Sequence, residues 1–219
     1  MGREKIVLKV LAGLILAMFV MAAEARADAV PAKLGPAEQA DVGRVERYLN
    51  TQKMLQAKFI QFADNGNKAS GMFSMLRPGR MRLVYDPPVK DFIVSDGWFV
   101  FYWDDDLKQQ SSQPLGSSLA DFFLRETIHL SGDVTVTRLL RQNGILEITI
   151  AETTDPGKGQ MTLVFEDKQG LQLRSWRVAD AQGLTTTVIL SDVRTSGLNF
   201  DDSMFLFRAP GGGTPRRNK

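Results

Sequence analysis

Regularly spaced turn signals constrain the fold of this chain more than any other feature of its sequence. From residue 54 onward, short segments of alternating polarity are separated by turn-forming groups such as Asp96-Gly97 and Asn143-Gly144. Asn-Gly and Asp-Gly pairs readily adopt the positive φ angles of tight hairpin turns, and alternation places successive side chains on opposite faces of a strand. The pattern therefore predicts a series of antiparallel hairpins.

Twelve segments have the length and alternation of β-strands. They lie near residues 56–63, 69–76, 80–86, 91–95, 98–103, 107–110, 133–140, 144–151, 160–166, 171–179, 184–194 and 204–208. So many consecutive strands with few helices imply one large, strongly curved sheet, and such a sheet must close on itself, stack on another sheet or be covered.

Two segments have helical periodicity and are available to cover the sheet. The first spans Pro36 to about Thr51, and the second is a short helix between Ser117 and Glu126. Each carries apolar residues three or four positions apart, which makes it amphipathic. We therefore expect a mainly β fold: an incomplete, half-open antiparallel β-barrel of about eleven strands, with helices forming a lid over an apolar cavity.

The first 27 residues have the three parts of an export signal. Basic residues at positions 3, 5 and 9 precede an apolar run from Val10 to Ala23, and an A-x-A cleavage motif follows at residues 25–27. The apolar run is shorter than the roughly 20 residues that a membrane-spanning helix needs. The sequence predicts a signal peptide over residues 1–27, a flexible leader over 28–36, a single domain over 37–210 and a flexible tail over 211–219.

Composition excludes several classes of site and partner. Because the chain contains no cysteine, it cannot hold disulfides, iron–sulfur clusters or cysteine-ligated zinc, and it cannot carry a cysteine-linked lipid anchor. The region up to Ala27 holds four of the 27 Lys and Arg residues and two of the 25 Asp and Glu residues, which leaves 23 of each sign. A neutral body argues against a nucleic-acid partner, since phosphate binding depends on clustered positive charge.

Catalytic and metal-binding motifs find little support. His129 is the only histidine, and no nucleophile motif adjoins it. The acidic run Asp104-Asp105-Asp106 lacks the ligand spacing of a calcium loop, and residues 211–213 resemble a phosphate-binding loop in glycine content alone. We therefore expect no enzymatic activity, no metal site and no cofactor.

Aromatic residues are concentrated in the first half of the mature chain, and both faces of the predicted strand at 98–103 are apolar. A two-layer core would account for each of these side chains taken singly. A single-layer sheet with too few helices to cover its concave face would instead line a pocket. The residues expected to line this pocket are Phe59, Phe73, Met75, Met81, Leu83, Tyr85, Phe92, Trp98, Val100, Leu119, Phe122 and Phe123.

The segment 76–88 is a hairpin bracketed by prolines that contains arginines at positions 77, 80 and 82. One interpretation is a basic turn that faces solvent. By alternation, Arg80 and Arg82 point away from the face that Leu83 and Tyr85 share. Arg77 ends the preceding strand, where its five donors could cap exposed carbonyl groups at a barrel mouth.

This hairpin and the segments around it resemble the LolA family of periplasmic outer-membrane lipoprotein carriers. Members of that family carry a hairpin of the type R-P-x-x-[FM] followed by alternating apolar positions and P-P, as residues 77–88 do here. Further matches precede the hairpin at residues 59–61 and 71–73 and follow it at 94–97 and 102–104, and the resemblance covers roughly 42–210. One departure is Leu83, where many relatives carry tryptophan or phenylalanine.

The resemblance implies a helix-capped, incomplete barrel whose cavity takes the acyl chains of a lipoprotein. It also implies that Arg77 locks the lid by hydrogen bonds to the lid backbone in the empty state, and that ligand displaces the lid. The partners it implies are lipoproteins, an inner-membrane ABC-type extractor and an outer-membrane acceptor. The carrier itself is expected to be a periplasmic monomer.

Two other functions stay open on the sequence. The same lipid-binding scaffold would suit an envelope-stress sensor or regulatory module, and it would suit a carrier of another lipid, such as a glycolipid or hopanoid.

Overall fold

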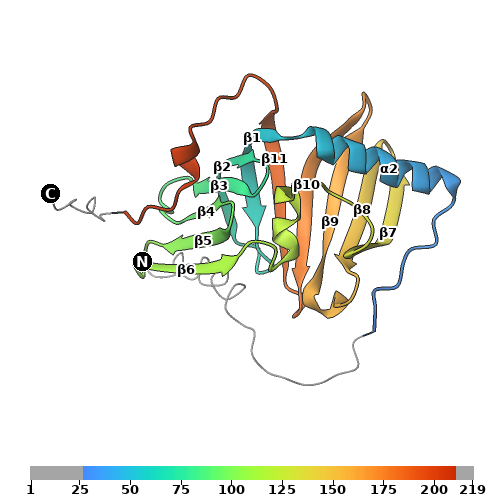
Figure 1. Cartoon of the computed structure of the whole chain (residues 1–219), viewed down its shortest axis with the longest axis horizontal. Coiled ribbons are helices and arrows are strands. Elements are labelled where there is room, and N and C mark those ends of the chain that lie inside the picture. The colour runs from blue at the N-terminus through green and yellow to red at the C-terminus, as the bar shows by residue number, and fades with distance from the viewer. Residues whose placement is uncertain (1–26, 211–219) are drawn as a thin grey trace.

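A computed structural model describes residues 27–210, so the predicted signal peptide up to Arg26 and the predicted tail lie outside the described residues. Eleven antiparallel strands form one sheet in the order β6-β5-β4-β3-β2-β1-β11-β10-β9-β8-β7 (Figure 1). The strands are β1 (Met54–Phe62), β2 (Lys68–Leu76), β3 (Arg80–Tyr85), β4 (Phe92–Asp96), β5 (Phe99–Asp104), β6 (Gln109–Pro114), β7 (Val134–Gln142), β8 (Ile145–Glu152), β9 (Gly159–Asp167), β10 (Leu171–Asp180) and β11 (Thr185–Arg194).

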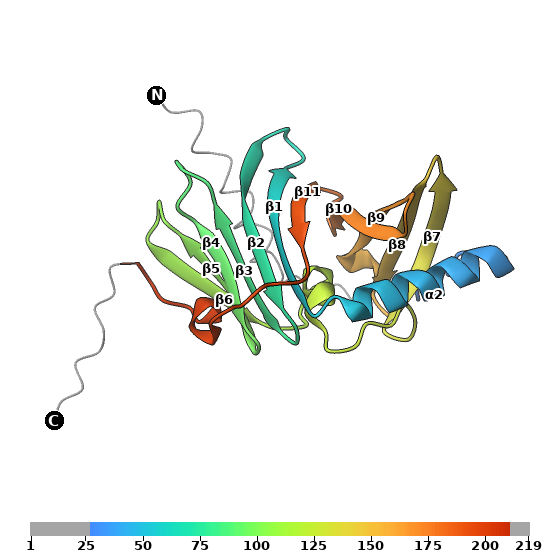
Figure 2. The same ribbon diagram turned by 90° about the horizontal axis from the view of Figure 1, so that it is seen from above.

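The sheet is curved but not closed. Strand β1 pairs with both β2 and β11, which joins the two halves of the chain at the centre of the sheet, and β6 and β7 form the two outer edges. Figure 2 shows the curvature, with β1–β6 and β7–β11 as its two arms. The prediction of a mainly β, half-open antiparallel barrel of about eleven strands is confirmed.

The twelfth predicted strand, near residues 204–208, is wrong. The chain forms a short 3₁₀-helix, η3 (Asp202–Phe205), and then continues without regular structure. Phe207 packs on Phe92, Phe101 and Trp103, so this segment crosses a face of the sheet and does not lie along an edge strand with which it could pair. The apolar residues that alternate in this segment pack on a face of the sheet, so their alternation does not indicate a strand.

The helix α2 (Pro36–Thr51) has the predicted bounds. Proline is favourable at the first position of this helix, because the N–H that it lacks would have no acceptor within the helix. The Glu38 carboxylate accepts a hydrogen bond from the Gly35 N–H at 2.7 Å. The buried side chains Val45 and Leu49 face the sheet. Figures 1 and 2 both show α2 lying across the arm formed by β7–β11.

The second predicted helix is a 3₁₀-helix, η1 (Leu119–Leu124), which follows β6. Its apolar side chains join those of α2 and of both arms of the sheet in one large core on the concave face. A smaller cluster on the opposite, convex face contains Phe92, Val94 and Trp103 and is covered by Phe207. The strand β5 is therefore covered on both faces, as its sequence predicts.

The segment 28–36 runs beside the edge strand β7. The Ala29 N–H donates to the Thr153 carbonyl at 2.7 Å, and the Ala32 N–H donates to the Val136 carbonyl at 2.8 Å. The second bond occupies part of the outer edge of β7, and the first lies just beyond the end of β8. The flexibility predicted for this leader stays a prediction; the structure adds two points at which it contacts the sheet.

Candidate functional site

A small cavity lies between the last turn of α2 and the centre of the sheet. Its volume is about 20 Å³, enough for little more than one water molecule. The polar side chains in its lining are Gln52 and Arg77, with the phenol of Tyr48. The lining comprises Tyr48, Leu49, Gln52, Leu55, Phe73, Met75, Arg77, Phe123, Ile128, Leu173, Trp176 and Leu190.

Trp176 forms the centre of an aromatic contact between the sheet and η1. Its ring centroid lies 5.7 Å from that of Phe73 on β2 and 5.1 Å from that of Phe123 on η1. Aromatic pairs at these separations pack favourably in edge-on or tilted arrangements. This contact closes the cavity on the side of η1, so the apolar wall is continuous from the strands to the covering segment.

Arg77, at the end of β2, fastens α2 over the cavity. Its side chain is 5% exposed, and its Nη2 donates to the carbonyl oxygen of Leu49, in the last turn of α2, at 3.0 Å. The backbone near Arg77 is bonded to two neighbouring segments. The Arg77 N–H donates to the carbonyl of Lys53, between α2 and β1, and the Gly79 N–H donates to the carbonyl of Leu124, at the end of η1, each at 2.8 Å. Burial lowers the pKa of the guanidinium from its usual value.

The two covering segments are also bonded to each other. The side chain of Asn50 donates to the Ile128 carbonyl at 2.8 Å and accepts from the Ile128 N–H at 2.9 Å. Glu46 accepts from the Leu130 N–H at 3.1 Å. We call α2 and residues 119–131 together the lid, because these bonds make them one cover over the concave face.

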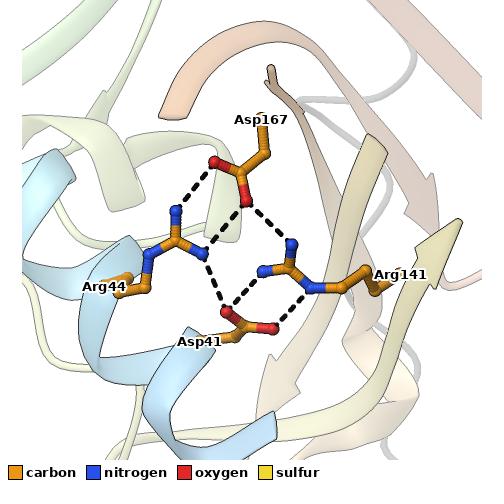
Figure 3. Close-up of polar contacts among 4 residues, drawn as sticks. All are labelled: Asp41, Arg44, Arg141 and Asp167. Carbon is orange, nitrogen blue, oxygen red and sulfur yellow. Dashed lines mark hydrogen bonds and ion pairs between the residues drawn. The ribbon is translucent and has the colours of Figure 1, made fainter. Parts of the chain in front are cut away.

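Four charged residues hold the first half of α2 against the arm of the sheet formed by β7–β11 (Figure 3). Asp41 and Arg44 project from α2, Arg141 from β7 and Asp167 from the end of β9. Arg44 donates to both oxygens of Asp167, at 3.0 and 2.7 Å, and Arg141 donates to Asp167 at 2.8 Å and to both oxygens of Asp41. We call this group the clasp; it contains two cations and two anions.

The clasp shifts the pKa values of its carboxyl groups downward. Burial alone would raise the pKa of Asp41, but hydrogen bonds and positive charge from Arg141 and Arg44 outweigh it and lower the pKa. Hydrogen bonds from Arg44 and Arg141 likewise lower the pKa of Asp167. Both carboxylates are therefore ionised at neutral pH.

A second hollow lies beside the edge of β7. It has a volume of about 390 Å³, and its walls are formed by the segment 31–34, the start of α2 and residues 130–136. Most of the lining side chains are apolar, among them Leu34, Val42 and Leu130.

Sequence comparison identifies the family. The family described as Outer membrane lipoprotein carrier protein LolA matches residues 50–208. The chain belongs to this family. Its curated relatives include the outer-membrane lipoprotein carrier proteins of Methylococcus capsulatus, 27% identical over 184 residues, and of Pseudomonas syringae, 26% identical over 188 residues. Each alignment covers 80% of this chain and 87% of the relative.

Among solved structures, a LolA superfamily protein from Nitrosomonas europaea covers 77% of this chain and 97% of its own length, at 9% identity and a TM-score of 0.44.

Most of the residues predicted for the cavity lie in the concave core of this LolA-family chain. Met81, on β3, is partly buried against that core. Val100, on β5, is also buried. The predicted residues buried in the core itself are Phe59, Phe73, Met75, Leu83, Tyr85, Leu119, Phe122 and Phe123. Phe73, Met75 and Phe123 also line the cavity beside Arg77.

Two predicted cavity residues lie elsewhere. Phe92 belongs to the convex cluster, because its neighbour Ile93 pairs with Leu83 and takes the concave side. Trp98 follows Gly97 in the turn before β5 and is 79% exposed, so it contributes nothing to either core. Because β5 begins at Phe99, the alternation of faces along the strand does not extend to Trp98.

Several cavity residues were not predicted, notably Trp176 and Leu173 on β10 and Leu190 on β11. The predicted residues lie on β1–β5 and η1 or in the turn before β5, whereas the cavity also draws on β10 and β11. The signal that was available is Trp176 itself, an isolated tryptophan within a strand whose exposed neighbours are arginines at 174 and 177.

The described residues include no group of three or more His, Asp or Glu side chains placed to hold a metal ion. Within residues 27–210, no helix combines the length and apolar character needed to cross a bilayer.

Proposed function

We propose that this protein is a periplasmic chaperone that binds the acyl chains of lipoproteins released from the inner membrane and carries them to the outer membrane. The observation that carries the proposal is an apolar concave sheet under a lid that polar bonds hold at its rims. Membership of the LolA family and the names of its curated relatives support the same function. The proposal assigns the chain no catalytic role.

The size of the cavity indicates that cargo requires movement of the lid. An acyl chain gains about 0.8 kcal/mol for each CH₂ group that it buries, so a long chain needs a deep apolar site. The space beside Arg77 is only about 20 Å³. In this proposal the lid is closed over the sheet, and acyl chains would enter between the lid and the sheet. The sequence predicts a lid over an apolar cavity, and at this end of α2 that cavity is small in the structure.

The bonds that hold the lid suit reversible binding. A hydrogen bond from a charged donor contributes about 1.5–3 kcal/mol, which is small beside the gain from burying a long acyl chain. Met75 and Met81 lie in or against the core of the sheet and can adapt to chains of different shape. In this proposal, Arg77 locks the empty lid and cargo displaces it.

The proposal includes the partners and location that the function requires. The protein would be exported by a signal peptide over residues 1–27 that is then cleaved, and it would act as a periplasmic monomer. It would receive lipoproteins from an inner-membrane ABC-type extractor and transfer them to an outer-membrane acceptor.

The direct test is lipoprotein release from spheroplasts. Adding the purified mature protein to spheroplasts that contain the extractor should move newly made lipoproteins into the supernatant as water-soluble complexes with the carrier. Spheroplasts without added protein provide the baseline. Lipoproteins that stay membrane-bound at a saturating carrier concentration would exclude the proposed role.

A second test uses Trp176 as a reporter of lid opening. In a variant with Trp98→Phe and Trp103→Phe, the remaining tryptophan contacts Phe123 of the lid, so a diacylated lipopeptide should change its fluorescence intensity and emission maximum. In the matched variant with Trp103→Phe and Trp176→Phe, only Trp98 remains, in the exposed β4–β5 turn, and its emission should stay constant. Equal responses from both variants would contradict binding under the lid.

A further inference from the structure

The side chain of Arg77 has hydrogen-bonding capacity that the closed structure does not use. A guanidinium group has five N–H donors. Within the described residues, Nη2 has an acceptor, the carbonyl of Leu49, whereas the buried Nε has none. No acidic side chain among residues 27–210 forms an ion pair with it.

A buried guanidinium such as that of Arg77, with a buried donor that has no acceptor, is unusual. Buried polar groups nearly always have hydrogen-bond partners, and buried charges are usually paired, because each unpaired group forgoes the solvation it had in water. A hydrophobic residue at position 77 would fill the same place without that cost. The side chain therefore carries donors that suit an acceptor absent from the closed protein.

The surroundings define the chemistry of that acceptor. Arg77 lines the small cavity together with apolar residues such as Leu55, Met75 and Trp176. A complementary ligand combines an apolar chain with oxygen acceptors at the point where the chain ends. Ester-linked acyl chains have this composition, because each carries a carbonyl oxygen next to its hydrocarbon.

We infer that Arg77 exchanges one carbonyl for another: it binds the Leu49 backbone carbonyl in the empty carrier and the ester carbonyl oxygens of the acyl chains in the loaded carrier. This inference rests on the proposed function and adds to it the recognition of the acyl linkage. Both acceptors are neutral carbonyl oxygens, so the guanidinium keeps a similar partner when the lid moves away. The free Nε provides a donor for a second oxygen.

The test compares two diacylated lipopeptides that differ only in whether ester or ether linkages join the chains to the glycerol unit. The ether compound keeps the hydrocarbon and lacks the carbonyl oxygens. The wild-type protein should bind the ester compound at least about 10-fold more tightly, as the loss of a charge-assisted hydrogen bond requires. Dissociation constants can be measured by titration of the tryptophan fluorescence.

Variants at two arginines separate recognition from locking of the lid. Arg77→Leu should reduce the ester-to-ether preference to about one, and it should strengthen binding of the ether compound because the lid loses a bond. Arg82→Leu is the matched control. Arg82 is also half-buried, but it lies on the convex side, where it donates to the Met204 carbonyl at 3.3 Å and sits 4.9 Å from the centre of the Phe92 ring. This control should keep the wild-type preference.

The possible outcomes distinguish the inference from the proposed function. Equal binding of the ester and ether compounds by the wild-type protein overturns the inference while leaving a lipid carrier intact, and this comparison needs no variant. A preference that persists in Arg77→Leu also overturns it. If neither compound binds, both the inference and the proposed function fail.

Discussion

Replacing Gly71 by alanine is expected to destabilise the fold by about 3 kcal/mol or more. A Cβ atom at this position would lie 2.0 Å from the Val84 carbonyl oxygen and 2.9 Å from Cε1 of Phe59. Gly71 pairs with Phe59 on β1 and with Tyr85 on β3, and these two rings contact each other edge to face with centroids 5.5 Å apart. A methyl group would have to displace backbone or break this contact. Urea unfolding followed by circular dichroism measures the loss.

Gly43→Ala is the matched control for this substitution. Gly43 lies within α2, where an added Cβ would meet only the flexible end of Arg47, at 3.4 Å. Alanine there should stabilise the protein by about 0.5–1 kcal/mol, because glycine is unfavourable inside a helix. If Gly71→Ala unfolded at the same urea concentration as the wild type, the fold would not require a glycine where Val84 and the Phe59 ring approach the backbone of β2.

Local signals in the sequence account for most of the strands. The bounds of ten of the hairpin strands from 54 to 194 were predicted to within about two residues, because turn residues such as Asn143-Gly144 and alternating polarity act over a few positions. β6 was the exception: it runs from Gln109 to Pro114, further than predicted, and its Gln and Ser residues carry no apolar alternation. Its position as an edge strand explains the polar composition.

The cavity could not be assembled from local signals, because it depends on register and on which face each arm presents. A bulge between Leu173 and Ser175 shifts the alternation of β10 by one residue, so that Leu173 and Trp176 both face the core opposite Phe165 and Leu163. Strict alternation would have turned Ser175 inward instead. A bulge within a strand leaves no clear mark in a single sequence, and the inward position of Trp176 was missed for this reason.

The clasp was missed because its members are far apart in the chain. Asp41 and Arg141 are 100 residues apart, and Arg44 and Asp167 are 123 residues apart. Taken alone in the sequence, each of the four residues looks like an ordinary charged residue on a polar face. Only the packing of α2 across β7 and β9 brings the opposite charges together.

Removing Asp167 is expected to lower the free energy of unfolding by about 2 kcal/mol. The Asp167 side chain is 8% exposed and accepts three hydrogen bonds from Arg44 and Arg141, so Asp167→Ala would leave these two cations facing each other with one carboxylate between them. Lys58→Ala provides the control, since it removes an ion pair with Asp192 in which both side chains are about two-thirds exposed. That substitution should have no measurable effect, because solvent screens such pairs. Urea unfolding at pH 7 measures both variants.

The effect of Asp167→Ala should depend on pH in a defined direction. The pKa of Asp167 in the folded protein lies below its ordinary value of 3.8, since the ionised form gains hydrogen bonds from Arg44 and Arg141. A group with a lowered folded-state pKa stabilises the protein above its unfolded-state pKa and loses that contribution as the pH falls through the folded-state value. The stability difference between the wild type and Asp167→Ala should therefore be constant from pH 7 to about pH 5 and should narrow below pH 3.8. A difference that persists undiminished in acid would mean that Asp167 stabilises the fold through packing and not through its charge.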